Sequence, residues 1–342
     1  RSPGQCEDRA SGFHSKSVES VAVRLPPAPV FVRLAASPPR SCPCASGTMP
    51  QTGRPLEPGF RRIPACAIIL IMQAVGFATF AILLYLVTSA ALTIRLARAE
   101  SGLSMNRGVV LLLGFVAVAL HAMALYPHLV TERGLNLAFF NAASLTALIT
   151  ALLLLMASIK QPVENLGIPL LPVAAATMAL ALWYPNQRAV IAETSWQLDL
   201  HILFSVLAYS MFALAAVQSV LLAIQDNHLR NRHPGGFIRA LPPLQVMERL
   251  LFQMIGVGYA LLSVALLTGI LFLEDIFAQH LAHKTILSIT GWVIFGVLLW
   301  GRWRFGWRGR KAIGWTLSGF AFLILAYFGS KLVLELILSR SA

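Results

Sequence analysis

Residues 136–159 read NLAFFNAASLTALITALLLLMASI, a stretch without one charged side chain. An α-helix of about 20 such residues crosses the ~30 Å hydrocarbon core of a bilayer. The backbone of a lipid-exposed segment has to satisfy its own hydrogen bonds, which an α-helix does within the segment. This stretch therefore predicts a transmembrane helix.

Seven further runs of similar length and apolarity occur along the chain, separated by short polar connections. None shows the short alternating segments from which transmembrane β-barrels are built. We therefore predict an all-α fold: a polytopic membrane helix bundle of about eight transmembrane helices. The predicted spans are residues 70–94, 108–127, 136–159, 166–184, 199–224, 251–273, 284–301 and 312–334.

The composition supports this class of protein and excludes others. Hydrophobic residues make up 57% of the chain and charged residues only 12%, whereas soluble domains carry about 25% charged residues. The formal net charge of +13 comes from short clusters between the apolar runs, and nucleic-acid binding needs a basic face on a soluble fold. The predicted partner is the lipid bilayer, and no nucleic acid is predicted as a partner.

The distribution of Lys and Arg predicts the orientation of the bundle. The connections after the first, third, fifth and seventh spans hold 13 of these residues. The connections after the second, fourth and sixth spans hold three, namely Arg133, Arg188 and Lys284. Since cytoplasmic loops carry the excess of positive charge, the first set is predicted to face the cytoplasm, and both ends of the bundle are predicted to be periplasmic.

The segment before the first span differs in composition. Ten of the 19 prolines lie within the first 60 residues, and no helical or strand periodicity is sustained there. Such a composition is typical of disorder, so residues 1–69 are predicted to be a disordered N-terminal extension and residues 70–342 the transmembrane domain. We expect the native start at Met72 or Met49. All four cysteines precede the first span, which leaves the membrane body without thiol chemistry.

Motifs of catalysis are not found in the sequence. No P-loop, Rossmann glycine pattern, HExxH or GxSxG motif stands in a fitting context, and the chain is not predicted to be an enzyme. The clearest polar residue within a span is Asn141, for which we predict an interhelical hydrogen bond rather than a substrate contact. Gly256 and Gly258 predict close helix packing, because small residues let helices approach each other.

The histidines are unevenly distributed. Five of the eight fall in the predicted outer half of the bundle: His121, His128, His201, His280 and His283. Histidine inside a bilayer is costly and usually faces the bundle interior or a polar cavity. Because neutral imidazole is a good axial ligand for haem iron, the five histidines predict a shared site at the outer face. Hydrogen-bonded residues of the membrane interface are the alternative interpretation.

Three segments resemble a known family. Residues 201–210, HILFSVLAYS, resemble the histidine-led helix of the membrane cytochrome c assembly proteins, the CcsA/CcmC class of haem handlers. GWRGRKA at residues 306–312 and AYFG at residues 326–329 are similar to the cytoplasmic loop and final helix of the same family. The eight-helix layout is most similar to the YpjD/HemX-type branch, and the resemblance covers roughly residues 72–338.

The resemblance implies a multi-pass protein of the bacterial inner (cytoplasmic) membrane. It also implies haem binding at the periplasmic face and a part in cytochrome c maturation, with other maturation proteins as partners. His201 matches the first external histidine of the family. His283 and His121 are our further candidates for holding haem, and no metal other than haem iron is predicted. The Trp-rich WGxxWxWD loop of the family is replaced at residues 274–284 by a segment without tryptophan. This difference leaves open an alternative: a haem-free accessory or regulatory protein of a transporter or membrane-associated enzyme.

Overall fold

The fold is known from a computed structural model, which describes residues 65–97, 106–131, 134–184, 190–191, 196–231, 241–272 and 279–329. All of these residues belong to the unit Arg62–Ala342. Residues 1–64 of the predicted N-terminal extension, and the first half of the loop at residues 274–284, lie outside the described residues. The first helix begins at Ala65, a few residues before the predicted boundary at residue 70.

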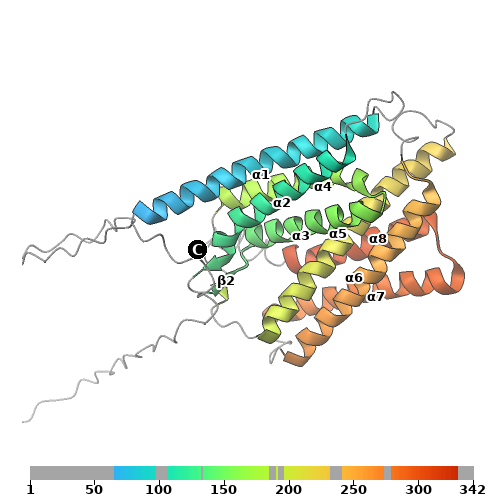
Figure 1. The fold of residues 1–342 in the computed structure, drawn as a ribbon. Helices are drawn as coiled ribbons and strands as arrows, with labels where there is room; N and C mark the ends of the chain where they lie inside the picture. Colours follow the sequence, from blue (N-terminus) through green and yellow to red (C-terminus); the bar gives the residue numbers. More distant parts are fainter. Residues whose placement is uncertain are drawn as a thin grey trace, which may run out of the picture. The chain divides into compact units, whose positions relative to one another are not determined.

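Within the described residues, eight helices are long and apolar enough to cross a membrane, which confirms the predicted all-α bundle (Figure 1). Each predicted span corresponds to one helix. The helices are α1 Ala65–Ala97, α2 Arg107–Leu129, α3 Phe139–Lys160, α4 Gly167–Trp183, α5 Trp196–Arg230, α6 Leu244–Phe272, α7 Gln279–Phe305 and α8 Gly309–Ile324. Four helices, α1, α5, α6 and α7, extend beyond the predicted bounds by several residues, whereas α8 ends ten residues before the predicted end of its span. The short elements are the 3-10 turn Glu164–Leu166, the π-turn Leu325–Gly329, and the strands β1 Val130–Thr131, β2 Gly134–Asn136 and β3 Val190–Ile191.

Several polar side chains within the helices donate a hydrogen bond to a backbone carbonyl of their own helix. The hydroxyl of Thr88 donates to the carbonyl of Leu84 at 2.7 Å, and that of Thr316 donates to the carbonyl of Ala312 at 2.7 Å. Because water is missing from a bilayer core, an unpaired hydroxyl there is costly. The local hydrogen bond makes these residues compatible with a membrane helix.

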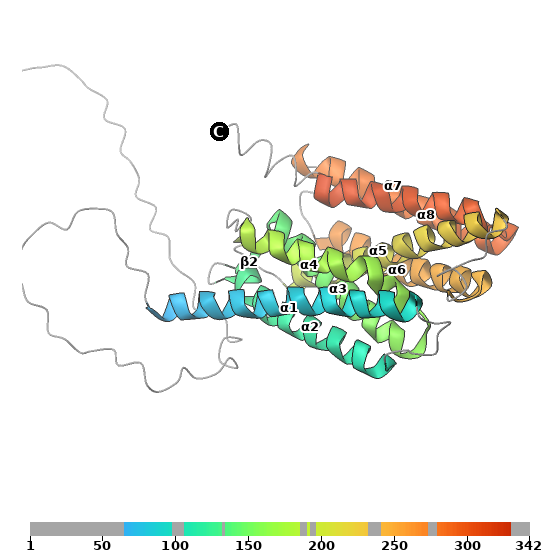
Figure 2. The same cartoon turned by 90° about the horizontal axis from the view of Figure 1, so that it is seen from above.

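The bundle packs as two groups of helices with separate apolar cores. Helices α1 to α4 enclose one core around Tyr85 and Leu171. Helices α5 to α8 enclose the other, in which the rings of Phe212 and Phe295 stack with centroids 3.9 Å apart. Leu154 of α3 contributes to this second core, so α3 joins the two groups. Figure 2 shows α7 and α8 running side by side, separated from α1 and α2 by the remaining helices.

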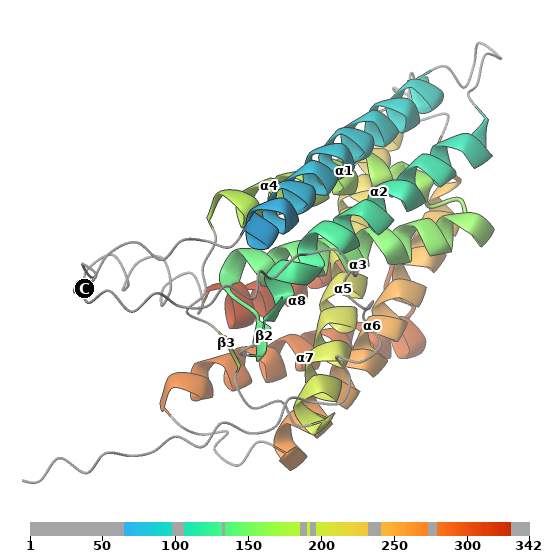
Figure 3. The ribbon, with the colours of Figure 1, turned by 60° about the vertical axis from the view of Figure 1, so that its left-hand side comes forward.

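A small antiparallel sheet covers one end of the bundle. Val130 of β1 pairs with Leu135 of β2, and Leu135 pairs in turn with Ile191 of β3. The sheet thereby ties the connection between α2 and α3 to the connection between α4 and α5 (Figure 3). By the distribution of Lys and Arg this end is periplasmic, an assignment that stays a prediction.

The segment 306–312, which carries part of the family resemblance, forms the corner between α7 and α8. Gly306 and Gly309 adopt positive φ values of 65° and 56°, a left-handed conformation that glycine enters without steric cost. The buried carboxylate of Glu248 in α6 accepts a hydrogen bond from the backbone N–H of Gly309 at 2.7 Å. A negative charge at the N-terminus of α8 is favourable, so this contact fixes the start of the last helix against α6.

The two glycines of α6 that predicted close packing differ. A Cβ at Gly258 would lie 3.1 Å from Cε1 of Phe212 in α5, which confirms a close approach of the two helices. A Cβ at Gly256 would meet nothing within 4 Å. Only Gly258 is therefore a packing glycine.

Replacing Gly319 with Ala is expected to destabilise the contact between α8 and α7. The added Cβ would lie 2.8 Å from Cε2 of Phe295, and overpacking of this kind costs about 1–3 kcal/mol. Thermal unfolding of the detergent-solubilised protein is expected to show a lower Tm. Gly314→Ala is the matched control on the same helix, since a Cβ there meets nothing within 4 Å. Equal losses of Tm in both variants would contradict the packing account.

Candidate functional site

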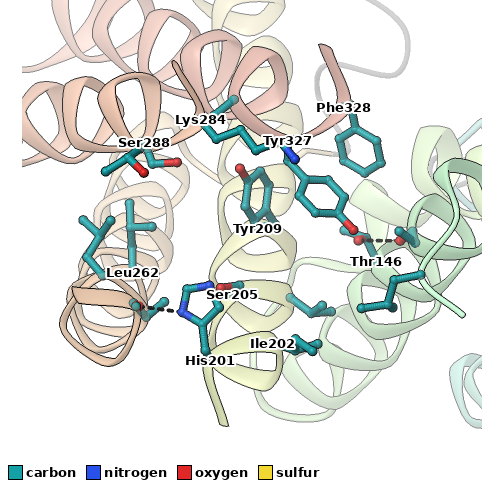
Figure 4. A pocket seen from close by; sticks show the side chains of 18 of the residues that line it. Thr146, His201, Ile202, Ser205, Tyr209, Leu262, Lys284, Ser288, Tyr327 and Phe328 are labelled. Carbon is teal, nitrogen blue, oxygen red and sulfur yellow. Dashed lines mark hydrogen bonds between the residues drawn. The ribbon is translucent and has the colours of Figure 1, made fainter. Parts of the chain in front are cut away.

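A cavity of about 280 Å³ lies among α3, α5, α6, the first turns of α7 and the π-turn after α8 (Figure 4). Its walls are mostly apolar. The described polar or aromatic side chains that line it are Thr146, His201, Ser205, Tyr209, Lys284, Thr285, Ser288, Tyr327 and Phe328. The cavity therefore combines an apolar volume with a few polar groups, as is typical of small-molecule sites.

His201, the first candidate from the sequence, lines this cavity from the first turns of α5. Its Nδ1 lies 2.8 Å from the carbonyl oxygen of Ala265 in α6. A carbonyl only accepts, so Nδ1 carries the proton and donates it, and in the neutral ring Nε2 keeps its lone pair. Nε2 has no hydrogen-bond partner among the described residues, and in Figure 4 it faces Ser205 on the cavity side. A hydrogen bond of this kind is what orients metal-ligating histidines.

Gly269 explains how α6 can support the imidazole so closely. A Cβ at this position would lie 3.1 Å from Cε1 and 3.3 Å from Nδ1 of His201. The hydroxyl of Thr268, one residue earlier, lies 3.4 Å from the same Nδ1. The ring thus packs directly on the α6 backbone at Gly269, which has no side chain, and the hydrogen bond to the Ala265 carbonyl holds it there.

The aromatic wall of the cavity comes from α5 and the π-turn. The hydroxyl of Tyr209 donates to the carbonyl of Leu323 at 2.9 Å, just before the π-turn begins. The ring of Tyr209 lies 5.9 Å from that of Tyr327 and 6.5 Å from that of Phe328, centroid to centroid. The segment 326–329, quoted above for its family resemblance, therefore meets the histidine-led helix at this cavity.

The opposite wall carries a positive charge. Lys284 and Ser288 lie one turn apart on α7 and line the cavity across from His201 in Figure 4. Lys284 is the one Lys, Arg, Asp or Glu among the described lining residues. An apolar ligand with an acidic group would find an aromatic wall, an imidazole nitrogen and an ammonium group in one cavity.

His121, the second candidate, does not line the cavity. It is fully buried between α1, α2 and α3, where its Nδ1 lies 3.2 Å from the Tyr85 hydroxyl and its Nε2 lies 2.9 Å from the Ser144 hydroxyl. Both ring nitrogens are in hydrogen bonds, so the one lone pair of the neutral ring is not left for an iron. The structure gives this histidine a place in the helix core and does not bring it together with His201.

Of the other outer histidines, only the side chain of His128 is described, and it does not line the cavity. His283 precedes the cavity residue Lys284 in α7, and its side chain lies outside the described residues, as does that of His280. His128 ends α2, and its Nε2 is buried without a hydrogen-bond partner among the described residues. The side chain of Asn141 donates to the backbone carbonyl of His128 at 3.3 Å, which confirms the predicted interhelical bond. No group of three His, Cys, Asp or Glu within the described ranges is arranged to hold a metal ion.

Sequence reasoning missed the residues that shape the cavity from α6 and α7. Gly269 and Ala265 are far from His201 in the sequence, and nothing in their own segment distinguishes them from other positions of an apolar helix. Lys284 was counted only as a basic residue of an outer connection. The one usable signal was the AYFG segment, whose Tyr327 and Phe328 do line the cavity.

Comparisons with known proteins agree with the resemblance noted in the sequence. The family model described as Cytochrome C assembly protein matches residues 109–338. The inner membrane protein YpjD of Escherichia coli (strain K12) is 32% identical over 268 residues, which cover 76% of this chain and 98% of that protein. The cytochrome c biogenesis protein CcsA of Trichodesmium erythraeum is 25% identical over 91 residues, 26% of each chain. No solved structure matches the chain.

Replacing His121 with Ala is expected to lower the free energy of unfolding by about 1–3 kcal/mol, because two buried hydroxyls lose their partner. Tyr85→Phe removes one hydrogen bond, worth about 0.6 kcal/mol on average inside membrane proteins. Unfolding of both single variants and of the double variant in detergent measures the coupling. Strictly additive losses would show that the Tyr85–His121 bond contributes nothing.

Proposed function

The chain belongs to the cytochrome c assembly protein family and is a multi-pass protein of the inner membrane, and from this premise we propose that it binds haem in the cavity beside His201. The proposal places haem handling at the predicted periplasmic face. It assigns the chain the role of a binding protein in cytochrome c maturation, without catalysis of its own.

The observation that carries the proposal is the geometry of His201. Nδ1–H is fixed on the Ala265 carbonyl at 2.8 Å, and Nε2 keeps its lone pair. Neutral imidazole in this tautomer is a common axial ligand of haem iron. The hydrogen bond from Nδ1–H to a carbonyl both orients such a ligand and raises the basicity of its other ring nitrogen. Among the described histidines that we predicted to hold haem, this is the one whose chemistry fits.

The remaining walls of the cavity fit the other parts of a haem molecule. Tyr209, Tyr327 and Phe328 would contact the apolar macrocycle, and the ammonium group of Lys284 would pair with a propionate. The volume of about 280 Å³ lies just below the range of about 300–1,000 Å³ usual for ligand pockets. Haem would therefore be only partly enclosed, which suits a protein that receives its cargo and passes it on.

In this proposal haem is the cargo, and other cytochrome c maturation proteins are the partners that deliver or accept it. The second axial position is assigned to His283, which lies next to the cavity residue Lys284 in the chain. His121 has no part in it, because its two ring nitrogens are engaged within the helix core.

Replacing His201 with Ala is expected to abolish the Soret shift that the purified wild-type protein gives with added haemin. His228→Ala is the matched control: it removes an imidazole from the same helix, where Nδ1 bonds the carbonyl of Ile224 at 2.9 Å near the other end. Adding free imidazole to His201→Gly is expected to restore the shift. A Soret shift in His201→Ala as large as that of the wild type would contradict the assignment. His283→Ala tests the second ligand in the same way.

Replacing Gly269 with Ala is expected to weaken haem binding by about 10- to 100-fold, the usual effect of disturbing a ligand's supporting contacts. The added Cβ would displace the His201 ring, which lies 3.1 Å away. Gly256→Ala, on the same helix with no atom within 4 Å, is the control. Absorbance titration with haemin gives both affinities, and equal affinities would exclude a supporting role for the bare backbone at Gly269.

A second candidate function is a haem-free accessory or regulatory protein of a transporter or membrane-associated enzyme. The modest volume of the cavity and the single imidazole among its described lining residues favour it. The wild-type spectrum with haemin separates the two candidates. No Soret shift, together with a stoichiometric partner recovered from haem-depleted membranes, would support this second function.

A further inference from the structure

The corner between α7 and α8 carries basic side chains that the proposed haem site does not use. Residues 302–311 hold five Lys or Arg and no Asp or Glu. Arg302 serves the fold, because its Nη1 donates to the carbonyl of Trp307 at 3.1 Å and its guanidinium lies 4.6 Å from the ring centroid of Phe252. The other four basic side chains are exposed, and we refer to them as the basic corner: Arg304, Arg308, Arg310 and Lys311.

The basic corner has no partner within the described part of the chain. None of its four side chains forms an ion pair or a hydrogen bond with a described residue. The carboxylate of Glu248 reaches this region from α6, but it is buried and accepts a hydrogen bond from the N–H of Gly309. Four exposed positive charges are therefore set against one buried carboxylate.

The charges of the basic corner do not stabilise the helix that follows it. Arg310 and Lys311 lie in the first turn of α8, which holds no acidic residue. The N-terminus of a helix carries a partial positive charge, so cations are unfavourable there. The basic corner is therefore better explained by anions that bind it from outside the chain.

The backbone of the corner is fixed by packing. Trp307 lies against α7, where a Cβ at Gly301 would be 2.5 Å from Cε3 of its ring. The ring centroid of Trp307 lies 5.5 Å from that of Trp315 in α8. A surface whose backbone is already ordered loses less conformational entropy when it binds. The corner can therefore present its basic side chains without first having to fold.

Exposed aromatic side chains beside the basic corner favour the membrane surface as the partner. Trp303 is 83% exposed and Phe305 is 61% exposed. The apolar span of α7 ends at Phe305 and that of α8 begins at Gly309, so the corner lies where both spans leave the hydrocarbon. Tryptophan is enriched at this level of a bilayer. A phospholipid offers phosphate to the charges and an apolar region to the rings, whereas an acidic protein in the water would pair only with the charges.

We propose that the basic corner binds the phosphodiester head groups of anionic phospholipids such as phosphatidylglycerol, with Trp303 and Phe305 at the level of the head groups. The four basic side chains are exposed, so a lipid can reach them directly. By the distribution of Lys and Arg this end of the bundle is predicted to face the cytoplasm, where anionic lipids attract basic segments next to transmembrane helices. The proposal is independent of haem binding.

Native mass spectrometry of the full chain in detergent, with phosphatidylglycerol and phosphatidylcholine added in equal amounts, tests the proposal. The wild type is expected to retain mainly phosphatidylglycerol. Arg308→Gln combined with Arg310→Gln is expected to weaken this adduct about fivefold for each residue, the effect of one basic side chain near an anionic lipid surface. Arg308→Lys combined with Arg310→Lys keeps the charges and is expected to keep most of the adduct.

Lys160→Gln combined with Arg230→Gln is the matched control. It removes the same charge from two exposed residues at the ends of α3 and α5, and it is expected to leave the adduct nearly unchanged. Equal losses in the corner pair and the control pair would show an effect of net charge alone and would overturn the site. Equal retention of both lipids by the wild type would also overturn it. An acidic protein that co-purifies with the wild type but not with the corner variant, without a lipid preference, would assign the corner to a protein partner and overturn the lipid proposal.

Discussion

A polar group within the hydrocarbon core of a bilayer has to find its hydrogen-bond partner within the protein, because no water is present there to supply one. His121 and His201 meet this demand in different ways. The imidazole of His121 is bonded at both nitrogens, to Tyr85 and Ser144. The imidazole of His201 gives one nitrogen to the Ala265 carbonyl and turns the other toward a cavity. The same residue type therefore bonds within a helix core in one place and leaves one ring nitrogen facing a cavity in the other.

The π-turn connects the geometry of the last helix to the cavity. A π-turn changes the backbone bonding from i→i+4 to i→i+5, and such turns are frequent at functional sites. The carbonyl of Leu323, just before the change, receives the hydroxyl of Tyr209. This bond satisfies a backbone group at the point where the regular helical pattern ends, and it holds Tyr327 and Phe328 against the cavity. Tyr209 is thus both part of the aromatic wall and a support for the π-turn that supplies the rest of that wall.

The sequence predicted what depends on local composition. Eight apolar runs predicted eight helices, since the length needed to cross a bilayer is a property of each run alone. The place of His201 at the start of an apolar helix also predicted its role as a candidate ligand. The support from Ala265 and Gly269 could not be predicted, because it depends on how α6 packs against α5. For the same reason the sequence did not separate His121 from His201: both lie near the outer end of a span, and only the packing decides which nitrogens are engaged.

The cavity lies where the two groups of helices meet, and their packing explains why a space remains there. Deeper in the bundle, the stacked rings of Phe212 and Phe295 join α5 to α7 through their side chains. Toward the predicted outer end, the same helices carry His201 and Lys284 on opposite sides of the cavity. The ring stack thus fills the space between the two helices below the site, and at the site this space is the cavity. A ligand entering between them would meet groups already held in place by contacts that it does not disturb, which is the usual condition for a preorganised site.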